Sequence, residues 1–340
     1  MSVSKRAESI WGEGKGHPYV EIPPFPKNML IELSNGCNHA CVFCANPLME
    51  RKVGRINKDL LERVMREARQ LGTEEIGFYT TGEPLVHKNL EDFTEQASTL
   101  GFKYIYISTN GAMGTPARFK KLIDAGMNSI KFSINAGSRE SYKQVHGKDD
   151  WDKVLENLKF VADYRKQEKK NIKLYASFII SKNVEHEIEL YKKVIGPFVD
   201  EIYFVPCGNQ TGNMSAAMTL LTPDTPVSRG DADNVCPLPF MRLHITVEGY
   251  MTLCCTDYQN YLTVEDLNNT TLEEAWKCDN FINARKMHLE KKLEGTLCGN
   301  CWLGKMDKIK PLHKELSHEI DFVKFYSKQK KHVTKRLLKE

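Results

Sequence analysis

The stretch from Met29 to Cys44 reads MLIELSNGCNHACVFC. A short apolar run typical of a buried strand is followed at once by three cysteines, spaced C-x3-C-x2-C at Cys37, Cys41 and Cys44. Three thiolates on one loop can hold three irons of a [4Fe-4S] cube and leave the fourth iron without a protein ligand. A structural zinc ion would need a fourth ligand, and His39 is the candidate within the loop.

Apolar runs continue to alternate with helical stretches from Met29 to Pro206. After the first strand, we expect strands that begin at Glu75, Tyr104, Ser129, Leu174 and Glu201. Between the strands we expect helices over residues 58–70, 88–99, 116–125, 150–169 and 184–195. Six strands joined by five helices predict an α/β fold with a parallel sheet, either flat and doubly wound or curled into a partial barrel. In both cases the polar residues that follow the strands meet at one edge, where α/β active sites are built.

The composition is that of a folded protein suited to metal or redox chemistry. The chain has 340 residues, of which 41% are hydrophobic and 27% charged, unlike a disordered protein. No apolar run approaches the about 18 residues of a membrane span, and residues 1–17 lack the apolar segment of a signal peptide. We therefore expect a cytoplasmic protein without a membrane partner. Ten cysteines in such a reducing compartment favour metal binding or redox chemistry over disulfides.

The positive charge is a property of the end of the chain. The net charge is +4, and residues 303–340 hold eleven Lys or Arg against five Asp or Glu. A solvated amphipathic helix explains such a tail better than a phosphate-binding surface, and we expect no nucleic-acid partner.

A second group of cysteines follows the end of the alternating pattern. Residues 211–232 are rich in Gly, Pro and Asp and predict a connector. Residues 240–255 predict a hairpin that turns at Glu248 and Gly249, and Thr271 is the expected N-cap of a later helix. Four cysteines around these elements can supply four thiolates to one metal centre, which at this point is an iron-sulfur cluster or a zinc ribbon. They are Cys236, Cys254, Cys298 and Cys301.

The first cysteine motif carries a specific resemblance. With Phe43 before its last cysteine, it has the form C-x3-C-x-aromatic-C and resembles the motif of the radical S-adenosylmethionine (radical SAM) enzymes. The resemblance implies a partial (β/α)6 barrel of TIM type, whose [4Fe-4S] cluster binds S-adenosylmethionine through the open iron. The electron from the cluster then cleaves this cofactor to a 5'-deoxyadenosyl radical, which abstracts hydrogen from a substrate carbon.

The same resemblance implies cofactor contacts at the ends of the strands. Residues 81–84, TGEP, resemble the family motif G-G-E-P, in which glycine allows a close approach and Glu83 accepts hydrogen bonds from the ammonium group of the cofactor. Polar residues that end the third and fourth strands are implied as ribose and carboxylate contacts. The expected cofactor-binding residues are Phe43, Gly82, Glu83, Ser108, Ser133 and Asn135.

The second cysteine group resembles the SPASM domains that follow radical SAM cores, because Cys236 and Cys254 belong to a C-x12-G-x4-C pattern. No cysteine follows Cys301, which makes the pattern closer to the shortened twitch version, a small α+β domain. The resemblance implies one auxiliary [4Fe-4S] cluster held by all four cysteines, with Cys254 and not its neighbour Cys255 as the ligand. We expect Cys278 to be an inert buried thiol.

Together these inferences divide the chain into five parts. We expect an N-terminal extension (1–27), a radical SAM core (28–210), a connector (211–232), an auxiliary cluster domain (233–302) and a basic helical tail (303–340). The resemblance also implies a flavodoxin- or ferredoxin-type reductant as a partner.

We expect the enzyme to oxidise an alcohol of a small molecule or sugar, with the auxiliary cluster accepting the electron of the substrate radical. Three alternatives stay open. Cys207 follows the sixth strand, and the enzyme would be an epimerase if this thiol returned a hydrogen atom to the substrate. Relatives with SPASM domains modify ribosomal peptides, so the substrate could be a peptide. If both cysteine groups held structural zinc, the protein would be a zinc-binding adaptor without enzymatic activity. Tyr79, Arg242 and His244 could also face a substrate, but no sequence pattern distinguishes them from core residues.

Overall fold

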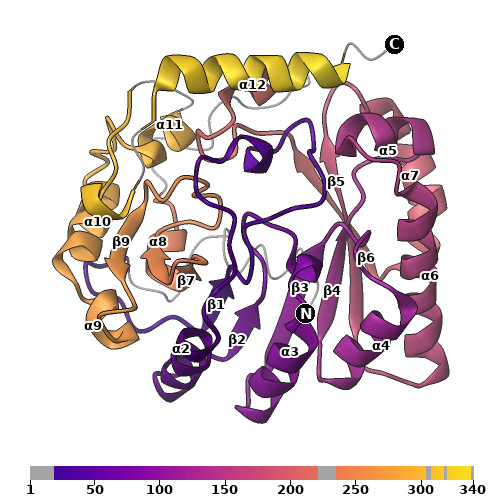
Figure 1. Ribbon diagram of the computed structural model, residues 1–340, viewed down its shortest axis with the longest axis horizontal. Helices are drawn as coiled ribbons and strands as arrows, with labels where there is room; N and C mark the ends of the chain where they lie inside the picture. Colours follow the sequence, from indigo (N-terminus) through magenta and orange to yellow (C-terminus); the bar gives the residue numbers. More distant parts are fainter. Residues whose placement is uncertain (1–18, 221–234, 304–307, 318–319, 338–340) are drawn as a thin grey trace.

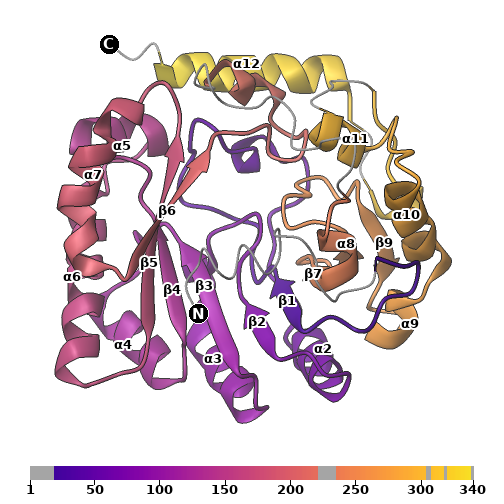
Figure 2. The same ribbon diagram turned by 180° about the vertical axis from the view of Figure 1, so that it is seen from behind.

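A nine-stranded sheet forms the centre of the molecule. The computed structural model describes residues 19–220, 235–303, 308–317 and 320–337 (Figure 1). The first six strands lie side by side in chain order and are parallel, as the alternating pattern predicts. The sheet curls into a partial barrel and is not a flat doubly wound sheet (Figures 1 and 2). The six strands are β1 (Asn28–Ile31), β2 (Glu75–Gly77), β3 (Tyr104–Thr109), β4 (Ser129–Ser133), β5 (Lys173–Ile180) and β6 (Glu201–Pro206).

Helices connect these strands and cover the outer face of the sheet (Figure 1). In α2 the buried residues Leu61, Val64 and Met65 recur at helical spacing, so the helix turns one apolar side to the sheet. The side chain of Asn57 accepts a hydrogen bond from Leu60 N and caps the start of this helix. The helices are α2 (Lys58–Gln70), α3 (Leu90–Thr99), α4 (Pro116–Asp124), α5 (Arg139–His146), α6 (Trp151–Gln167) and α7 (Ile188–Ile195), with short 3-10 helices η1 (Asn46–Leu48), η2 (Pro84–Val86), η3 (Glu185–Glu187) and η4 (Gly196–Phe198).

The two faces of the sheet differ in chemistry. Successive side chains of a strand point to opposite faces. In β3, Ile105 and Ile107 belong to the apolar core under the helices, which places Tyr106 and Ser108 on the opposite face. Paired residues of neighbouring strands share a face, and the register extends this face from Ser177 through Ser133 to Arg242. We call it the inner face; it is lined by Asn28, Leu30, Glu75, Gly77, Tyr104, Tyr106, Ser108, Lys131, Ser133, Tyr175, Ser177, Arg242 and His244.

The C-terminal part continues the same sheet. Strand β7 (Arg242–Ile245) pairs in parallel with β1, followed by antiparallel β8 (Tyr250–Thr252) and β9 (Thr263–Asp266). The hairpin turns at the predicted position, where Gly249 has a φ of 86°. The predicted cap is also confirmed, because Thr271 and Glu274 form a capping box. The remaining elements are α8 (Leu238–Met241), α9 (Leu272–Trp276), α10 (Asp279–Leu289), α11 (Leu297–Leu303), η6 (Lys314–Leu316) and α12 (Phe322–Leu337).

Three elements differ from the sequence predictions. The predicted strand that begins at Glu75 covers the run EIGFYTTG, residues 75–82, but β2 ends at Gly77, because the following residues turn towards the first cysteine loop. Helix α5 was not predicted, although Ser138 caps its start and Gly147, with a φ of 70°, ends it. Part of the predicted connector is η5 (Ser215–Leu220), whose side chains are mostly buried.

Some predicted regions include residues that the structure does not describe. Residues 1–18 of the predicted extension, 221–232 of the predicted connector and 233–234 of the predicted auxiliary domain lie outside the described residues, as do 304–307, 318–319 and 338–340 of the predicted tail. In the tail, α12 is helical as expected and lies across the first cysteine loop (Figures 1 and 2). Over the described residues, no helix combines the length and the apolar character needed to cross a membrane.

Candidate functional site

The first cysteine loop, residues 35–46, starts just beyond β1 and is held from two sides. Its Val42 N donates to Val145 O at 2.8 Å, next to the end of α5. From the opposite end of the sequence, His332 of α12 donates through Nε2 to the carbonyl of Cys41 at 2.9 Å. The loop that carries the three cysteines is therefore fixed by elements far apart in sequence.

The TGEP turn supports the loop from below. Glu83 N donates to Gly36 O at 2.9 Å. A Cβ atom on Gly82 would come within 2.8 Å of the carbonyl oxygen of Gly36 and would also collide with the carbonyl of Ser34. Glycine is therefore required at position 82 for a reason that does not involve a cofactor, because a larger residue would not fit beneath the cysteine loop. Its predicted role in cofactor binding stays a prediction.

A buried ion-pair network, absent from the sequence predictions, holds the two halves of the molecule together beside the loop. Arg51 donates through Nη2 to Glu32 at 2.5 Å and to Glu248 at 2.7 Å. Glu32 follows β1 directly and also accepts hydrogen bonds from Val247 N at 3.1 Å and from the hydroxyl of Thr81. Removing one member of such a buried network leaves an unpaired charge, so these residues act as a unit.

The thiols of the loop are costly to ionise without a cation. Burial raises the pKa of Cys37 to about 12, and the neighbouring carboxylate of Glu83 adds to the shift. Burial also raises the pKa of Cys44, partly offset by the hydroxyl of Tyr258. A cationic cluster reverses this balance, because it binds the thiolate and displaces the proton. The donor set therefore fits an iron-sulfur cluster.

His39 does not complete a zinc site with all three cysteines. The ligand atoms of His39, Cys41 and His146 lie within 4.8 Å of one another, a set that leaves out the other two cysteines of the loop. The Nδ1 atoms of the two histidines are 3.2 Å apart, and His146 donates through Nε2 to Ile134 O at 2.5 Å. The two histidines support Cys41 from behind, and His146 Nδ1 is 3.4 Å from its sulfur.

Glu83 is buried and engaged by strand β3. Its Oε1 accepts from the Thr109 hydroxyl at 2.6 Å and from Leu85 N at 3.0 Å, while Oε2 accepts from Asn110 N at 2.7 Å. Burial raises the pKa of this carboxyl, and the three hydrogen bonds oppose that effect. Its predicted bond to the ammonium group of the cofactor remains a prediction, as does a cofactor contact of the buried Phe43.

The predicted serines form a row of hydroxyls on the inner face. Ser108 Oγ is 3.3 Å from Ser133 Oγ, and Ser177 donates to Ser133 at 3.4 Å. Ser177 was not predicted, although a serine within the apolar run LYASFII was a usable signal. Asn135 has a φ of 55°, and its Oδ1 accepts from Ile179 N at 3.1 Å, so this side chain fastens β5 to the end of β4. The cofactor contacts of these residues stay predictions.

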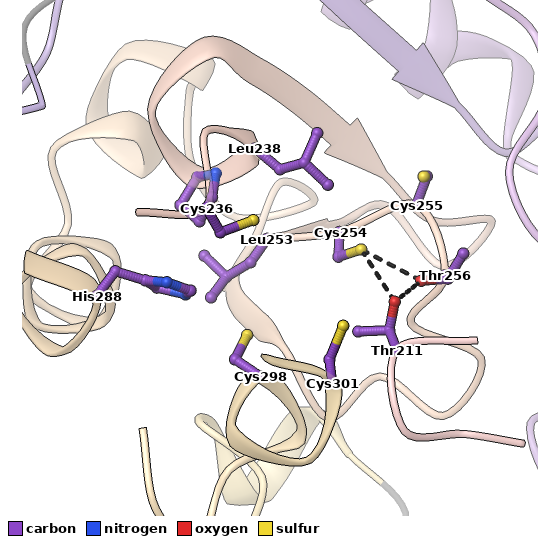
Figure 3. A pocket seen from close by; sticks show the side chains of 11 residues that line it. Thr211, Cys236, Leu238, Leu253, Cys254, Cys255, Thr256, His288, Cys298 and Cys301 are labelled. Carbon is purple, nitrogen blue, oxygen red and sulfur yellow. Dashed lines mark hydrogen bonds between the residues drawn. The ribbon is translucent and has the colours of Figure 1, made fainter. Parts of the chain in front are cut away.

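The second site gathers the four predicted cysteines around one space (Figure 3). Cys236 precedes α8, Cys254 follows β8, and Cys298 and Cys301 project from α11. His288 of α10, Thr211, Thr256, Cys255 and apolar residues complete the lining. Burial and the charges of the other three thiols raise the pKa of Cys298 well above its usual value. Four converging thiols that repel one another as thiolates need a cation, so this donor set fits a metal cluster.

The spacing of these thiols distinguishes a cluster from a zinc ion. Four thiolates at about 2.3 Å from one zinc ion lie about 3.8 Å from one another. In the part of the chain that the structure describes, no three of the four sulfur atoms lie all within 4.8 Å of one another. This wider arrangement favours a four-iron cluster, which is larger than a single ion.

The three remaining cysteines are not part of either group. The sulfur of Cys255 points away from the other four (Figure 3). The hydroxyls of Thr211 and Thr256 lie 3.7 Å and 3.3 Å from the sulfur of Cys254, and Cys254 as the ligand of the pair stays a prediction. Cys278 stands at the start of α10, half-buried, with Sγ 3.8 Å from Val264 O, in keeping with an inert thiol. Cys207 is 2% exposed and faces Ala217 O of η5 at 3.9 Å.

A chain of contacts that the sequence did not reveal joins the two cysteine sites. The hydroxyl of Tyr258 lies 3.5 Å from Cys44 Sγ and donates to Gln210 Oε1 at 2.8 Å. The next residue, Thr211, has its hydroxyl 3.7 Å from Cys254 Sγ. We call Gln210, Thr211 and Tyr258 the bridge between the two sites.

The backbone of the bridge is strained. Gln210, Thr211 and Gly212 have φ values of 49°, 57° and 79°, a left-handed run that ordinary side chains avoid. A Cβ atom on Gly212 would lie 2.9 Å from Asn300 Cβ in α11, between two cysteines of the second site. The predicted domain boundary therefore coincides with a tightly fitted segment.

Two family models match the chain. The Radical SAM superfamily model matches residues 31–194, and the iron-sulfur cluster-binding domain SPASM matches residues 236–302.

Curated relatives match only part of their own length. A probable GTP 3',8-cyclase from Saccharolobus solfataricus is 28% identical over 137 residues, 40% of this chain and 44% of that protein. A PqqA peptide cyclase from Rhizobium meliloti is 33% identical over 123 residues, 36% of this chain and 32% of that protein. The chain thus aligns with less than half of each of these relatives.

Solved structures share the fold over most of the chain. BtrN in complex with AdoMet and 2-DOIA has a TM-score of 0.54 and 19% identity, and covers 86% of this chain and 96% of its own. SuiB from Streptococcus suis bound to S-adenosylmethionine has a TM-score of 0.61 and 16% identity, with coverages of 82% and 71%. Native anSMEcpe with bound AdoMet has a TM-score of 0.60 and 14% identity, with coverages of 92% and 96%.

Proposed function

Because the chain belongs to the radical SAM superfamily and carries a C-terminal SPASM domain, we propose that it oxidises a small-molecule or sugar alcohol by radical chemistry. Cys37, Cys41 and Cys44 would hold the cluster that binds S-adenosylmethionine, and the four cysteines of the second site would hold one auxiliary cluster. When bound, the first cluster supplies the electron that cleaves S-adenosylmethionine, and the auxiliary cluster supplies an acceptor for the electron of the substrate radical.

The observation that carries this proposal is the closed ligand set of the second site. Four buried or half-buried cysteines surround it, which leaves no iron free to bind substrate directly. A cluster of this kind is suited to electron transfer. In the bridge, Tyr258 lies at Cys44, Thr211 lies at Cys254, and the Tyr258 hydroxyl donates to Gln210, so these contacts connect the two sites.

The residues around the first loop protect radical chemistry in this proposal. Tyr258, which lies beside the half-buried Cys44, is shielded from water, and α12 covers the loop through His332. Excluding water keeps a reactive radical from side reactions. The reductant is an external one-electron donor. One relative is named as a cyclase of GTP and another as a cyclase of a peptide, so the relatives do not agree on a substrate class.

Anaerobic reconstitution tests the proposal. We expect about eight irons and eight sulfides per chain, since the seven ligands divide into three and four. With a strong reductant and S-adenosylmethionine, the protein should form 5'-deoxyadenosine. A colourless protein that contains zinc and forms no 5'-deoxyadenosine would establish the adaptor alternative.

Epimerisation is a second candidate, and one observation favours it. The sulfur of Cys255 points away from the four thiols of the second site (Figure 3), and its charge contributes to the pKa of Lys131 and of Arg242 on the inner face. In such a reaction a thiol S–H bond breaks to give a hydrogen atom to the substrate carbon, and the sulfur radical takes one electron from the reductant and one proton from water. Cys207, the donor expected from the sequence, is covered by η5, so we rank Cys255 before it.

Deuterated water separates the two candidates. A thiol hydrogen exchanges with solvent, so an epimerase would place deuterium on the product carbon. We expect none in an oxidase. Variants Cys255→Ala and Cys207→Ala then identify the donor if deuterium is found, because the variant that lacks the donor would still form 5'-deoxyadenosine without product.

A further inference from the structure

Two cations, Lys131 and Arg242, lie on the inner face of the sheet. Lys131 lies on β4 and Arg242 on β7, and the register places both on this face. Arg242 is 9% exposed and its Nε has no hydrogen-bond partner among the described residues. Across the described ranges, neither cation forms an ion pair.

The two cations approach the same groups although three strands separate them in the sheet. Lys131 Nζ stands 5.9 Å from the ring centre of Tyr79, and this ring packs edge-on against Tyr106 at 5.8 Å. Tyr106, Tyr79 and Cys255 all contribute to the pKa of Arg242. The curl of the sheet therefore brings both cations to the region of Tyr79.

Burial lowers the pKa of Arg242 and nearby groups raise it, but no carboxylate among the described residues forms an ion pair with its guanidinium. Glu75 lies on the same face and contributes to the pKa of Arg242, and it also accepts a hydrogen bond from Asn28 Nδ2 at 2.6 Å. Beside it on β7, His244 is fully buried, and neither ring nitrogen has a partner in the described structure. A buried charge without a partner is costly, and proteins usually keep one only where a ligand or another charge satisfies it.

We propose that Lys131 and Arg242 bind an oxyanion of the substrate, a carboxylate or a phosphate, at the inner face. The inference rests on the proposed function and defines its substrate class as an anionic molecule. The two cations fix one end of the substrate, and the hydroxyls of Ser108, Ser133 and Ser177 on the same face are placed to meet its polar groups. Arg supplies paired donors in a plane, which suits either oxyanion.

Thermal unfolding of the reconstituted protein tests this inference with a readout other than turnover. The midpoint is measured with inorganic phosphate, with acetate, and with chloride at the same ionic strength. We expect phosphate or acetate to raise the midpoint above its value in chloride, because an anion that binds only the folded state stabilises it. The ion that acts identifies a phosphate or a carboxylate.

Variants locate the effect. Lys131→Met and Arg242→Met should each reduce the shift to less than half, and the double variant should abolish it. In chloride both variants should unfold at the same temperature as the original protein or above it, since an uncompensated charge has been removed. Lys159→Met is the matched control, because Lys159 also lies over an aromatic ring, that of Phe198, but on an outer helix. It should keep the full shift.

Three results would overturn the inference. One is the absence of any shift with both anions. Another concerns the variants: either the shift survives in the double variant, or both single variants have lower midpoints in chloride. Lower midpoints would mean that protein groups satisfy the cations. The third is loss of the shift when saturating S-adenosylmethionine is present, which would assign the site to the cofactor. Formation of 5'-deoxyadenosine by the original protein decides separately whether the proposed function holds.

Discussion

The two cysteine sites bring several thiols together in opposite ways. The first takes its three thiols from eight consecutive residues on one loop, whereas the second collects four from three segments between Cys236 and Cys301. The first loop is shaped mostly by contacts with other elements, such as Gly82 beneath it and α12 above it. The second site has its thiols on the elements of the C-terminal part, so it forms only when that part folds. Short loops cost little entropy to close, and long ones cost more.

The comparison teaches that the two sites should fail differently. Loss of a ligand at the first site removes a cluster from a loop that other elements still support. Loss of a ligand at the second site removes the group that ties α8, β8 and α11 together. We therefore expect loss of a ligand at the first site to reduce activity before stability, and loss of a ligand at the second site to impair folding first.

The largest effect should follow the combined replacement of Cys37, Cys41 and Cys44 by Ala. About four of eight irons should disappear, and 5'-deoxyadenosine formation should fall to background while the protein stays soluble. Iron analysis and product chromatography measure both. Persistent cleavage of S-adenosylmethionine would show that the site assignment is wrong.

Replacement of one ligand of the second site should be nearly as severe but different in kind. Cys298→Ala leaves three thiols with an incompletely bound cluster, so we expect low solubility, loss of about four irons and loss of turnover. Cys278→Ala is the control, because its thiol is outside the site and its removal should leave the iron content unchanged. A soluble Cys298→Ala protein with full iron would contradict the assignment.

A smaller effect should come from Gly82→Ala. The added methyl group would collide with the carbonyls beneath the cysteine loop and push the loop away, at a cost of about 1–3 kcal/mol. We expect partial loss of the first cluster, with the second intact, in iron analysis and electron paramagnetic resonance. Gly196→Ala provides a comparison, since the nearest atom to its Cβ would be 3.8 Å away. Equal iron in both variants would refute this reading.

The smallest effect should be that of Tyr258→Phe, which removes the hydroxyl between the sites. A hydrogen bond to a cluster thiolate is worth about 1 kcal/mol, so the first cluster should become harder to reduce by an amount on the order of tens of millivolts. Its iron content should stay full. Tyr261→Phe, in the same loop, removes a buried hydroxyl that accepts from Ile320 N and should leave the potential unchanged. Identical potentials in the two variants would show that the bridge does not couple the sites.

Much of this architecture was predictable from the sequence because its signals are local. The alternating strands and helices, the turn at Gly249 and the cap at Thr271 each depend on neighbouring residues. The cysteines were predictable for a similar reason, since their spacing is itself the signal. The four at the second site converge as predicted (Figure 3).

The features that escaped prediction depend on contacts between distant residues. Tyr258 reaches Cys44 across 214 positions, and Arg51 reaches Glu248 across 197. The parallel pairing of β1 with β7 likewise joins two ends of the chain, and it places the predicted auxiliary domain in the same sheet as the core. No local sequence pattern predicts such partners, because Tyr, Arg and Glu also occur at many positions that make no such contact.

The left-handed run at Gln210, Thr211 and Gly212 has a consequence for recombination of this protein with its relatives. A chimera joined between the two family regions, within residues 213–235, would keep this run from one parent and receive its partners in α11 and after β8 from the other. Such a chimera would then combine the strained turn of one parent with contact residues of the other parent that do not match it. A junction that respects the molecule lies before Asn209, so that the turn travels with the C-terminal cysteines as one inherited unit.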